Sequence, residues 1–352
     1  MSANAYATLL TSDSYLPGAL VLGRRLALLS SAPCSLVVLV SDNVSKSSRQ
    51  LLAEVYDSVV LVPRIISKDI PNLHLLGRPD LEDTLTKCHL WNLPFSKVVY
   101  LDADVVPVQS LDLLFEEELG PGDVLAAPDS GWPDYFNSGV LVLKPHAATY
   151  DELINEAAKE GSSFDGGDQG LFNTVFPDWN RLSFCYNVTQ QASSQYEYLP
   201  ALLANASKVR AFHFIGSQKP WESRAFETCG YPDSSRPFYA AWWDTFDTHY
   251  FGERAAAVFT ASSGVDTELP EGLLTTTVDK TLGEAWNLSL DKHVNEWDRE
   301  ETSGYTPGVL ELNPPKELVE AYEVNDDKVE PEKQFPWDAH KVPATRYFPE
   351  DR

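Results

Sequence analysis

The sequence is organised around one stretch, Val99-Tyr100-Leu101-Asp102-Ala103-Asp104-Val105-Val106-Pro107. The run 98–101 is β-branched and aromatic, which predicts a buried strand, and two aspartates spaced i and i+2 end it. Two carboxylates held at the rigid end of a strand repel each other unless a cation lies between them, and hard oxygen ligands suit Mg²⁺ or Mn²⁺. An isolated Asp-x-Asp is equally compatible with an acidic loop, so the rest of the chain must decide.

Composition narrows the class of protein. With 352 residues the chain can form one large domain, or one domain and a tail. It carries 27 Lys and Arg against 52 Asp and Glu, a net charge of −25, which argues against nucleic acid and anionic membranes as partners. No secretory signal pattern and no apolar run of the ~18 residues that a membrane span needs is apparent, so we expect a soluble, cytoplasmic protein. The four cysteines are scattered without a C-x-x-C pair, which predicts reduced thiols.

The N-terminal part alternates strands and helices. Its periodicity predicts strands at 5–11, 36–40 and 59–62, with helices at 15–30 and 45–56 between them. This alternation is typical of an α/β fold with a mostly parallel central sheet and flanking helices, in which ligands bind at the carboxyl ends of the strands. Thr11, Ser12 and Tyr15 follow the first strand and are therefore candidates for nucleotide binding. Neither a G-x-G-x-x-G nor a P-loop motif occurs, which argues against a dinucleotide or P-loop site.

The rest of the chain predicts further α/β elements followed by a tail. We expect an irregular segment at 69–83, helices at 84–93, 111–118, 147–159, 168–176 and 238–251, and strands at 123–127, 140–143 and 209–215. From about residue 252 the sequence becomes rich in Ala, Ser and Thr and then acidic, which predicts a loosely packed extension. We therefore expect one folded domain at 1–255 and a partly irregular acidic extension at 256–352.

A second acidic site lies in Phe164-Asp165-Gly166-Gly167-Asp168-Gln169. Its two glycines allow the backbone to approach a ligand closely, and Asp168 begins the predicted helix at 168–176. On the local sequence alone, Asp168 can also be a simple N-cap of that helix. This stretch is therefore a candidate ligand-binding site with a structural alternative.

Two further groups of residues are candidates. Tyr196 and Tyr198 alternate and would point the same way from an extended segment, although such a pair is commonly ordinary surface. His213 lies in a predicted strand that leads to Gly216 and Lys219, residue types that suit a phosphate; a buried core histidine is the alternative. Imidazole is a suitable third ligand for Mn²⁺ beside two carboxylates.

Four stretches together resemble the glycogenin family. Members of this family are self-glucosylating, retaining enzymes of glycosyltransferase family 8. They are Leu101-Asp102-Ala103-Asp104; Gly131-Trp132-Pro133-Asp134 with Phe136-Asn137-Ser138-Gly139-Val140; Ser163-Phe164-Asp165-Gly166-Gly167-Asp168-Gln169-Gly170; and His213-Phe214-Ile215-Gly216 with Lys219-Pro220-Trp221. Their order and spacing also agree, over roughly residues 5–251. The resemblance implies a single nucleotide-sugar-binding domain of the GT-A type that moves glucose from UDP-glucose onto its own tyrosine and then onto a growing α-1,4-glucan, priming glycogen synthesis.

The resemblance also implies roles for residues. Mn²⁺, with Mg²⁺ as the alternative, would be held by Asp102, Asp104 and His213. The acceptors would be Tyr196 and Tyr198, and the residues acting at the reacting centre would be Asp168, Asp165 and Lys219. The donor-binding positions match Leu9, Thr11, Ser12, Tyr15, Arg78, Lys87, Ala103, Asn137, Ser138, Gln169 and Gly216, although Ser12 stands where the family often has asparagine. The partners implied are UDP-glucose, the protein's own glucan chain, a second copy in a homodimer, and glycogen synthase.

Several alternatives stay open at this point. A family 8 transferase could act on another alcohol acceptor, and retention could follow from double displacement through Asp168 or from same-face attack within an ion pair. The sequence does not decide which tyrosine is glucosylated, whether transfer is within or between subunits, or which UDP-sugar is preferred. A phosphatase of the haloacid dehalogenase type would also place Asp-x-Asp after a strand. It needs a later Gly-Asp-x-x-x-Asp, however, and Phe172 stands four positions after Asp168.

Overall fold

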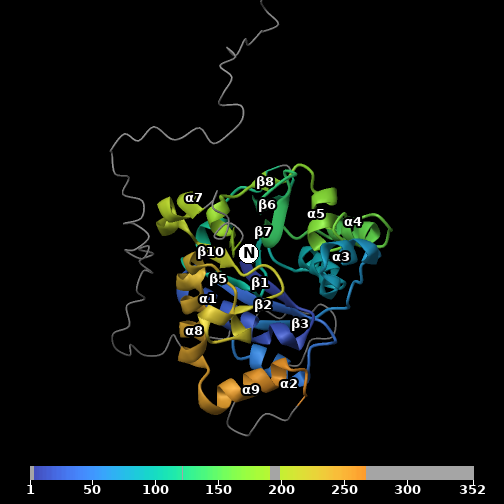
Figure 1. Ribbon diagram of the computed structural model, residues 1–352. Coiled ribbons are helices and arrows are strands. Elements are labelled where there is room, and N and C mark those ends of the chain that lie inside the picture. The colour runs from blue at the N-terminus through green and yellow to red at the C-terminus, as the bar shows by residue number, and fades with distance from the viewer. Residues whose placement is uncertain (1–3, 121, 191–198, 267–352) are drawn as a thin grey trace, which may run out of the picture. The chain divides into compact units, whose positions relative to one another are not determined.

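The computed structural model describes residues 4–120, 122–190 and 199–266. Its centre is a seven-stranded sheet of order β3-β2-β1-β4-β7-β6-β8 (Figure 1). The strands are β1 (Asn4–Leu10), β2 (Cys34–Val40), β3 (Ser58–Leu61), β4 (Val98–Leu101), β6 (Val124–Pro128), β7 (Phe136–Leu143) and β8 (Asn180–Arg181). β1 pairs in parallel with β2 and β4, and β2 with β3, whereas β7 runs antiparallel to both β4 and β6. The predicted α/β fold with a mostly parallel central sheet is confirmed.

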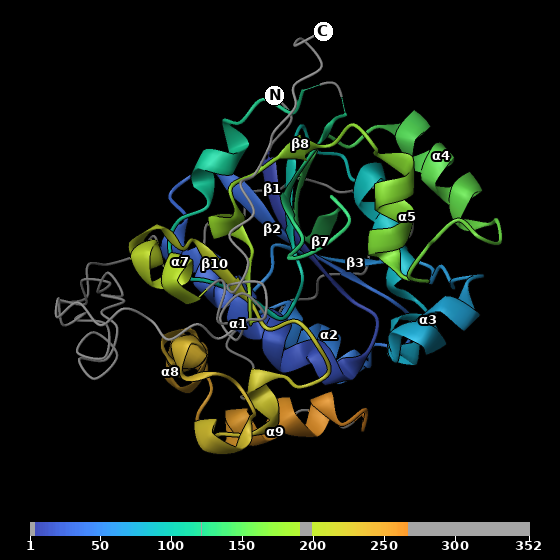
Figure 2. The ribbon, with the colours of Figure 1, turned by 45° about the horizontal axis from the view of Figure 1, so that its top comes forward.

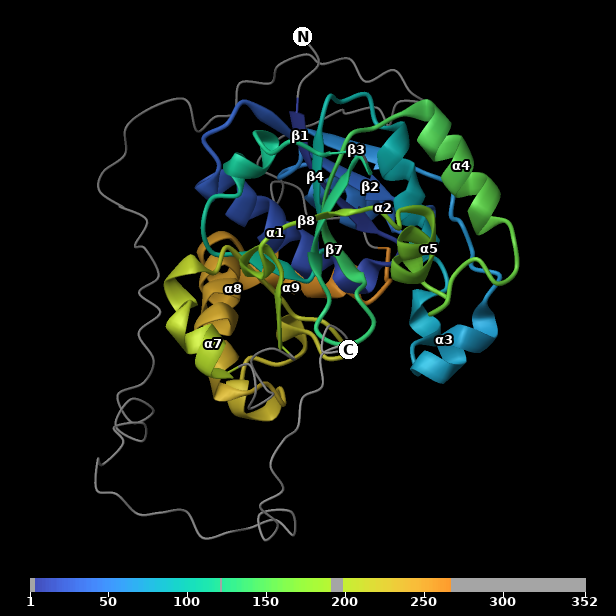
Figure 3. The ribbon, with the colours of Figure 1, turned by 90° about the horizontal axis from the view of Figure 1, so that it is seen from above.

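Helices cover both faces of this sheet (Figures 2 and 3). The side chains of β1 alternate between two cores, with Tyr6 and Leu10 buried on one face and Ala5 and Ala7 on the other. The first core includes residues of α1 (Leu16–Leu29), α2 (Lys46–Leu52), α8 (Arg236–His249) and α9 (Gly252–Ser262). The second includes residues of η3 (Thr84–Asn92), α4 (Ala147–Ala157) and α5 (Asp168–Val175). Because both faces of the sheet are buried, its central strands are nearly continuous apolar runs.

A small second sheet lies beside the end of β4. It has the order β5-β10-β9, with β5 (Val105–Pro107), β10 (Ala211–His213) and β9 (Val188–Thr189). β10 runs antiparallel to β5, so that His213 pairs with Val105, and parallel to β9, so that His213 also pairs with Thr189. This register places the histidine next to the Asp-Ala-Asp turn.

The structure corrects several local predictions. The segment 69–83 is not irregular but contains α3 (Ile70–Leu76), which has Pro71 in its first turn and ends at Gly77, where φ is 72°. The predicted helices at 84–93 and 111–118 are 3₁₀ segments, η3 and η4 (Asp112–Phe115). β7 starts at Phe136 and not at 140, because Phe136 pairs with Pro128 of β6.

The remaining short elements are α7 (Leu199–Ala204), η1 (Asp13–Tyr15), η2 (Pro79–Leu81), η5 (Phe184–Tyr186), η6 (Ala206–Lys208), η7 (Pro220–Glu222), η8 (Phe226–Thr228) and η9 (Asp233–Ser235).

The expected domain boundary at residue 255 falls inside α9. Val258 and Ala261 are fully buried in the core that α1 and α8 share, so the packed part of the chain continues beyond that boundary. The rest of the expected extension, 267–352, lies outside the described residues. Across the described ranges, we find no helix that combines the length and the apolar character needed to span a bilayer.

His249, at the end of α8, makes the stability of this region depend on pH. Burial, together with the nearby Arg24 and Arg254, lowers its pKa from 6.5 to about 4. Since the unfolded chain then binds a proton that the folded chain does not, stability falls as the pH drops from about 6.5 towards 4. When the pH is lowered from about 7.5 to about 5, the free energy of unfolding of wild type, measured in urea, should fall by about 1 kcal/mol more than that of a His249→Gln variant. The expected difference is this small because the ring is only half-buried. Equal losses in the two proteins would show that this histidine does not control the effect.

Candidate active site

A cleft of about 640 Å³ lies at the carboxyl ends of β1 and β4. β1 leads there to Thr11 and Ser12, and β4 leads there to Asp102. Every residue predicted from the sequence to bind the metal, bind the donor or act in catalysis lines this cleft: Leu9, Thr11, Ser12, Tyr15, Arg78, Lys87, Asp102, Ala103, Asp104, Asn137, Ser138, Asp165, Asp168, Gln169, His213, Gly216 and Lys219. The predicted acceptors, Tyr196 and Tyr198, lie outside the described residues.

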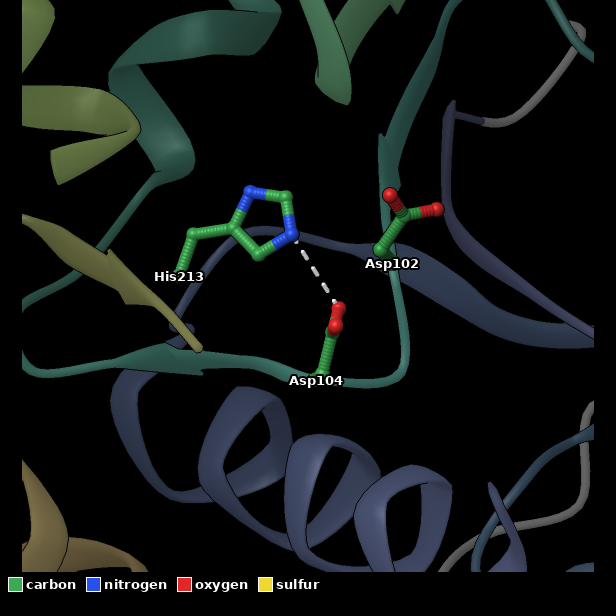
Figure 4. Close-up of side chains that lie close together, drawn as sticks. All are labelled: Asp102, Asp104 and His213. Atoms are coloured by element: carbon green, nitrogen blue, oxygen red, sulfur yellow. Dashed lines mark ion pairs between the residues drawn. The ribbon is translucent and has the colours of Figure 1, made fainter. Parts of the chain in front are cut away.

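Asp102, Asp104 and His213 form a cluster in this cleft (Figure 4). One ligand atom from each residue lies within 4.8 Å of the others. Two carboxylates and an imidazole are a donor set that suits Mn²⁺. His213 is buried, as expected for a core histidine. Its Nε2 nevertheless lies 3.3 Å from Asp104 Oδ1 and the residue lines the cleft, so it belongs to the site. The residues present therefore fit a divalent cation.

The backbone around the cluster is fixed on both sides. The Asp102 N–H donates to the carbonyl oxygen of Gly139 (2.9 Å), and the Phe214 N–H donates to the carbonyl oxygen of Asp104 (3.0 Å). Gly139 also makes room for the imidazole, since a Cβ at this position would lie 2.3 Å from His213 Cε1. Any side chain at 139 would therefore displace the histidine.

Two asparagines determine which imidazole nitrogen can bind a cation. The Gly139 N–H donates to Asn137 Oδ1 (3.0 Å), which fixes the orientation of that amide. The same oxygen accepts from Asn187 Nδ2 (2.7 Å), so the oxygen of Asn187 faces His213 Nδ1 (3.1 Å). An oxygen there requires Nδ1 to carry the proton, which leaves the lone pair of Nε2 for the cluster.

Lys219 is the direct partner of Asp104. Its ammonium contacts Asp104 Oδ2 and donates to the carbonyl oxygen of Phe214 (3.0 Å), and both charged side chains are buried. Burial raises the pKa of a carboxyl, but Lys219 and His213 together hold the pKa of Asp104 well below its usual range. Asp104 therefore stays ionised, as a metal ligand must.

Lys87 joins the two acidic sites. Its Nζ lies 2.9 Å from Asp102 Oδ1, 2.6 Å from Asp168 Oδ2 and 3.3 Å from the carbonyl oxygen of Ser138. Lys87 is only 3% exposed, and although burial lowers the pKa of an ammonium, Asp102 and Asp168 raise the pKa of Lys87 above its ordinary value. The Tyr100 hydroxyl adds a further hydrogen bond to Asp102 Oδ1 (2.6 Å). Lys87 therefore stays charged and orients both carboxylates.

Asp168 and Asp165 have different surroundings. Gly167 is the N-cap of α5 and no side-chain cap forms there, so the simple N-cap interpretation of Asp168 is wrong; its carboxylate pairs with Lys87. Asp165 Oδ1 instead accepts the N–H groups of Gly167 (2.8 Å) and Gly170 (3.0 Å), which hold the loop in place. Burial raises the pKa of Asp165.

The sequence did not single out several residues of this site. Asn187 is the first residue of an Asn-x-Thr pattern of the N-glycosylation type, and no other local feature marked it. Nothing in the nearby sequence indicated that it would contact His213. Asp129 accepts from Gln169 Nε2 (2.7 Å) and lines the cleft, as do Asp83 and Gln190. Tyr100, which donates to Asp102, was also missed. Its one signal in the sequence was its position along β4, where side chains alternate between the two faces of the sheet.

Comparison with solved structures identifies the fold. The apo form of the glycosyltransferase GlyE of Streptococcus pneumoniae superposes with a TM-score of 0.50 at 19% identity, over 74% of this chain and 64% of that chain. An active-site mutant of LgtC gives a TM-score of 0.50 at 16% identity, over 72% of this chain and 99% of that chain. The predicted GT-A type fold is therefore confirmed.

Sequence comparison shows that the chain is a glycosyltransferase and identifies its family. The model of glycosyl transferase family 8 matches residues 7–225, and the chain belongs to that family. It is 41% identical to Glycogenin-1 of Mus musculus over 321 residues, which is 85% of this chain and 93% of that protein. It is 34% identical to the Glycogenin of Komagataella phaffii over 406 aligned positions, covering 98% of each chain. The resemblance inferred from the four motifs is confirmed.

Proposed function

We propose that this protein transfers glucose from UDP-glucose to its own Tyr196 or Tyr198 and then extends the attached glucan, the activity that primes glycogen synthesis. One observation carries the proposal above all: the Asp102, Asp104 and His213 cluster opens into the same cleft as the Lys87–Asp168 pair. The cluster that we assign to the metal and diphosphate and the carboxylate that we assign to the sugar therefore share one cleft. The similarity to the glycogenins of mouse and Komagataella phaffii supports the choice of donor and acceptor.

In this proposal Asp102, Asp104 and His213 hold Mn²⁺, with Mg²⁺ as the alternative. The imidazole favours Mn²⁺, because Mg²⁺ prefers oxygen ligands alone. When bound, the ion supplies charge neutralisation for the departing diphosphate. Lys219, close to the cluster, and Gly216, with φ 102°, line the side of the cleft that we assign to the diphosphate. Leu9, Thr11, Ser12 and Tyr15, at the end of β1, line the part that we assign to the nucleoside.

The sugar is assigned to the other side of the cleft. Transfer passes through an oxocarbenium-like centre, and the ionised carboxylate of Asp168 can stabilise its positive charge or attack it. Lys87 orients that carboxylate, while Asn137, Ser138 and Gln169 offer polar contacts to the sugar hydroxyls. The phenol proton of the acceptor passes to the leaving phosphate. Double displacement and same-face attack are both compatible with this geometry.

The acceptor tyrosines, the partners and the cellular site extend the same proposal. We assign the acceptor to the Tyr196–Tyr198 segment, and a homodimer would allow transfer between subunits. Glycogen synthase would take over the primed glucan. Residues 1–255, continued by the rest of α9, would form the catalytic unit in the cytoplasm, and the remaining extension would be available for partners.

Self-transfer is tested by intact mass. With UDP-glucose and Mn²⁺, wild type should gain mass in steps of one hexose, whereas Tyr196→Phe/Tyr198→Phe should gain none. Each single Phe variant identifies the tyrosine used, and UDP release measured in parallel shows that the donor site is intact in the double variant. Hexoses on the double variant would mean that the acceptor lies elsewhere.

Asn187→Leu tests the cation site without relying on turnover. Leucine has the same branched shape and number of side-chain heavy atoms as asparagine but cannot accept the Nδ1–H of His213, so the imidazole loses its fixed tautomer and orientation. We expect Mn²⁺ affinity, measured by electron paramagnetic resonance, to fall about 10–100-fold. Asn187→Asp keeps an acceptor for Nδ1–H but loses the donor to Asn137 Oδ1, so its affinity should lie between those of wild type and Asn187→Leu. Unchanged Mn²⁺ binding in Asn187→Leu would show that His213 is not a ligand.

A further inference from the structure

Two aromatic rings, one exposed and one partly buried, stack beside the cleft. Tyr135, in the loop between β6 and β7, lies with its ring centroid 4.5 Å from that of Phe164, in the loop between α4 and α5, at an interplanar angle of 19°. Phe164 is 45% exposed, and Tyr135 is only partly buried. Rings of this size are normally buried, and exposed apolar surface at the edge of a cleft is typical of a ligand-binding surface.

Both rings are joined to the wall of the cleft. The Asp129 N–H donates to the carbonyl oxygen of Tyr135 (2.8 Å), and the Asp129 side chain accepts from Gln169. Phe164 directly precedes Asp165. Asp129, Asp165 and Gln169 all line the cleft, on the side assigned above to the sugar. The aromatic pair therefore continues the surface of the sugar site outward.

Three further exposed apolar side chains lie in the segments around the two rings. α3 is held against the loop of Phe164 by a hydrogen bond from Asn72 Nδ2 to the carbonyl oxygen of Ser163 (3.0 Å). At the end of α3, Leu76 lines the cleft and is 50% exposed, and the adjacent Leu75 is 87% exposed. Trp132, in the same loop as Tyr135, is 95% exposed. We call the set Leu75, Leu76, Trp132, Tyr135 and Phe164 the apolar rim.

We propose that the apolar rim binds the growing glucan chain, with the Tyr135–Phe164 pair as the platform on which a pyranose ring lies. A pyranose has faces of C–H groups that pack on aromatic rings, while its hydroxyl groups stay in water at the edge. The glucan is neutral, which suits a protein of net charge −25 that repels polyanions. This inference rests on the proposed function, because it takes the glucan from that reaction. It predicts that the rim governs chain length rather than the first transfer.

The test replaces both rings. Tyr135→Leu/Phe164→Leu keeps apolar bulk for folding but removes the flat faces, and Phe251→Leu, an exposed ring outside the cleft lining, is the matched control. Binding of maltoheptaose is measured by calorimetry without donor, in a Tyr196→Phe/Tyr198→Phe background confirmed by mass to carry no glucan. We expect about tenfold weaker binding in the ring variant, which corresponds to about 1.4 kcal/mol, and no change in the control.

Chain length gives a second, independent readout. With the acceptor tyrosines restored, the ring variant should receive its first hexose at the wild-type rate but stop at shorter chains, as seen by intact mass. The proposal is overturned if maltoheptaose binds the ring variant as tightly as wild type, or if only self-association changes in sedimentation, since the rim would then be a contact between copies. If wild type adds no hexose at all, the proposed function fails, while maltoheptaose binding still decides whether the rim holds a glucan.

Discussion

Asp104→Asn is expected to lower glucose transfer by about 10²–10³-fold and to destabilise the fold by about 3 kcal/mol. Asp104 is buried between Lys219 and His213, so it serves both the cation site and the charge balance of the interior. A neutral amide removes a ligand, and it also leaves the ammonium of Lys219 buried without its counter-charge. Transfer is measured as hexose incorporation at saturating UDP-glucose, and stability by urea unfolding of the same preparation.

A double variant separates the two losses. In Asp104→Asn/Lys219→Met both charges are gone, and methionine fills the space of the lysine stem, so most of the stability should return. Transfer should stay low, because the ligand is still missing and Lys219 is lost from the side of the cleft assigned to the diphosphate. If activity returned together with stability, Asp104 would have only a structural role, and the assignment of the cation site would be wrong.

The sequence could predict those residues of the site that directly follow a recognisable strand. Asp102 and Asp104 follow a run whose β-branched pattern indicates a buried strand, and this strand is β4. Thr11 and Ser12 follow β1 in the same way. Since ligands gather at the carboxyl ends of parallel strands, these residues could be expected to meet without any structure.

The position of His213 depends on information that no local pattern carries. It reaches the aspartates because β10 pairs with β5 in one register, and a shift by one residue would turn the imidazole to the other face. We associated His213 with Asp102 from the four family motifs and not from periodicity. Asn187 had no motif to mark it, since its contact with the imidazole spans 26 residues of sequence.

Segments with mixed signals account for the errors in secondary structure. Pro71 and Gly77 suggested an irregular segment, but one lies in the first turn of α3 and the other ends it, positions where these residues are favoured. The 3₁₀ geometry of η3 likewise has no distinct sequence period. It matters for the site, because η3 carries Lys87 into the cleft.

Lys87→Met is expected to reduce transfer by about 100-fold and to destabilise the protein by about 3 kcal/mol near neutral pH. Lys87 is the buried cation between Asp102 and Asp168, so its loss leaves Asp168 ionised in the interior without a partner.

A comparison of three variants by urea unfolding at about pH 7.5 decides whether the charge or the packing of Lys87 matters. Lys87→Met/Asp168→Asn should recover part of the stability lost in Lys87→Met, because the buried Asp168 charge is gone while Asp102 still lacks its ammonium partner. Lys87→Arg keeps the positive charge beside both carboxylates, so it should lose less stability than Lys87→Met. No recovery in the double variant would mean that the lysine acts by filling space, and orientation of Asp168 by Lys87 would no longer explain transfer.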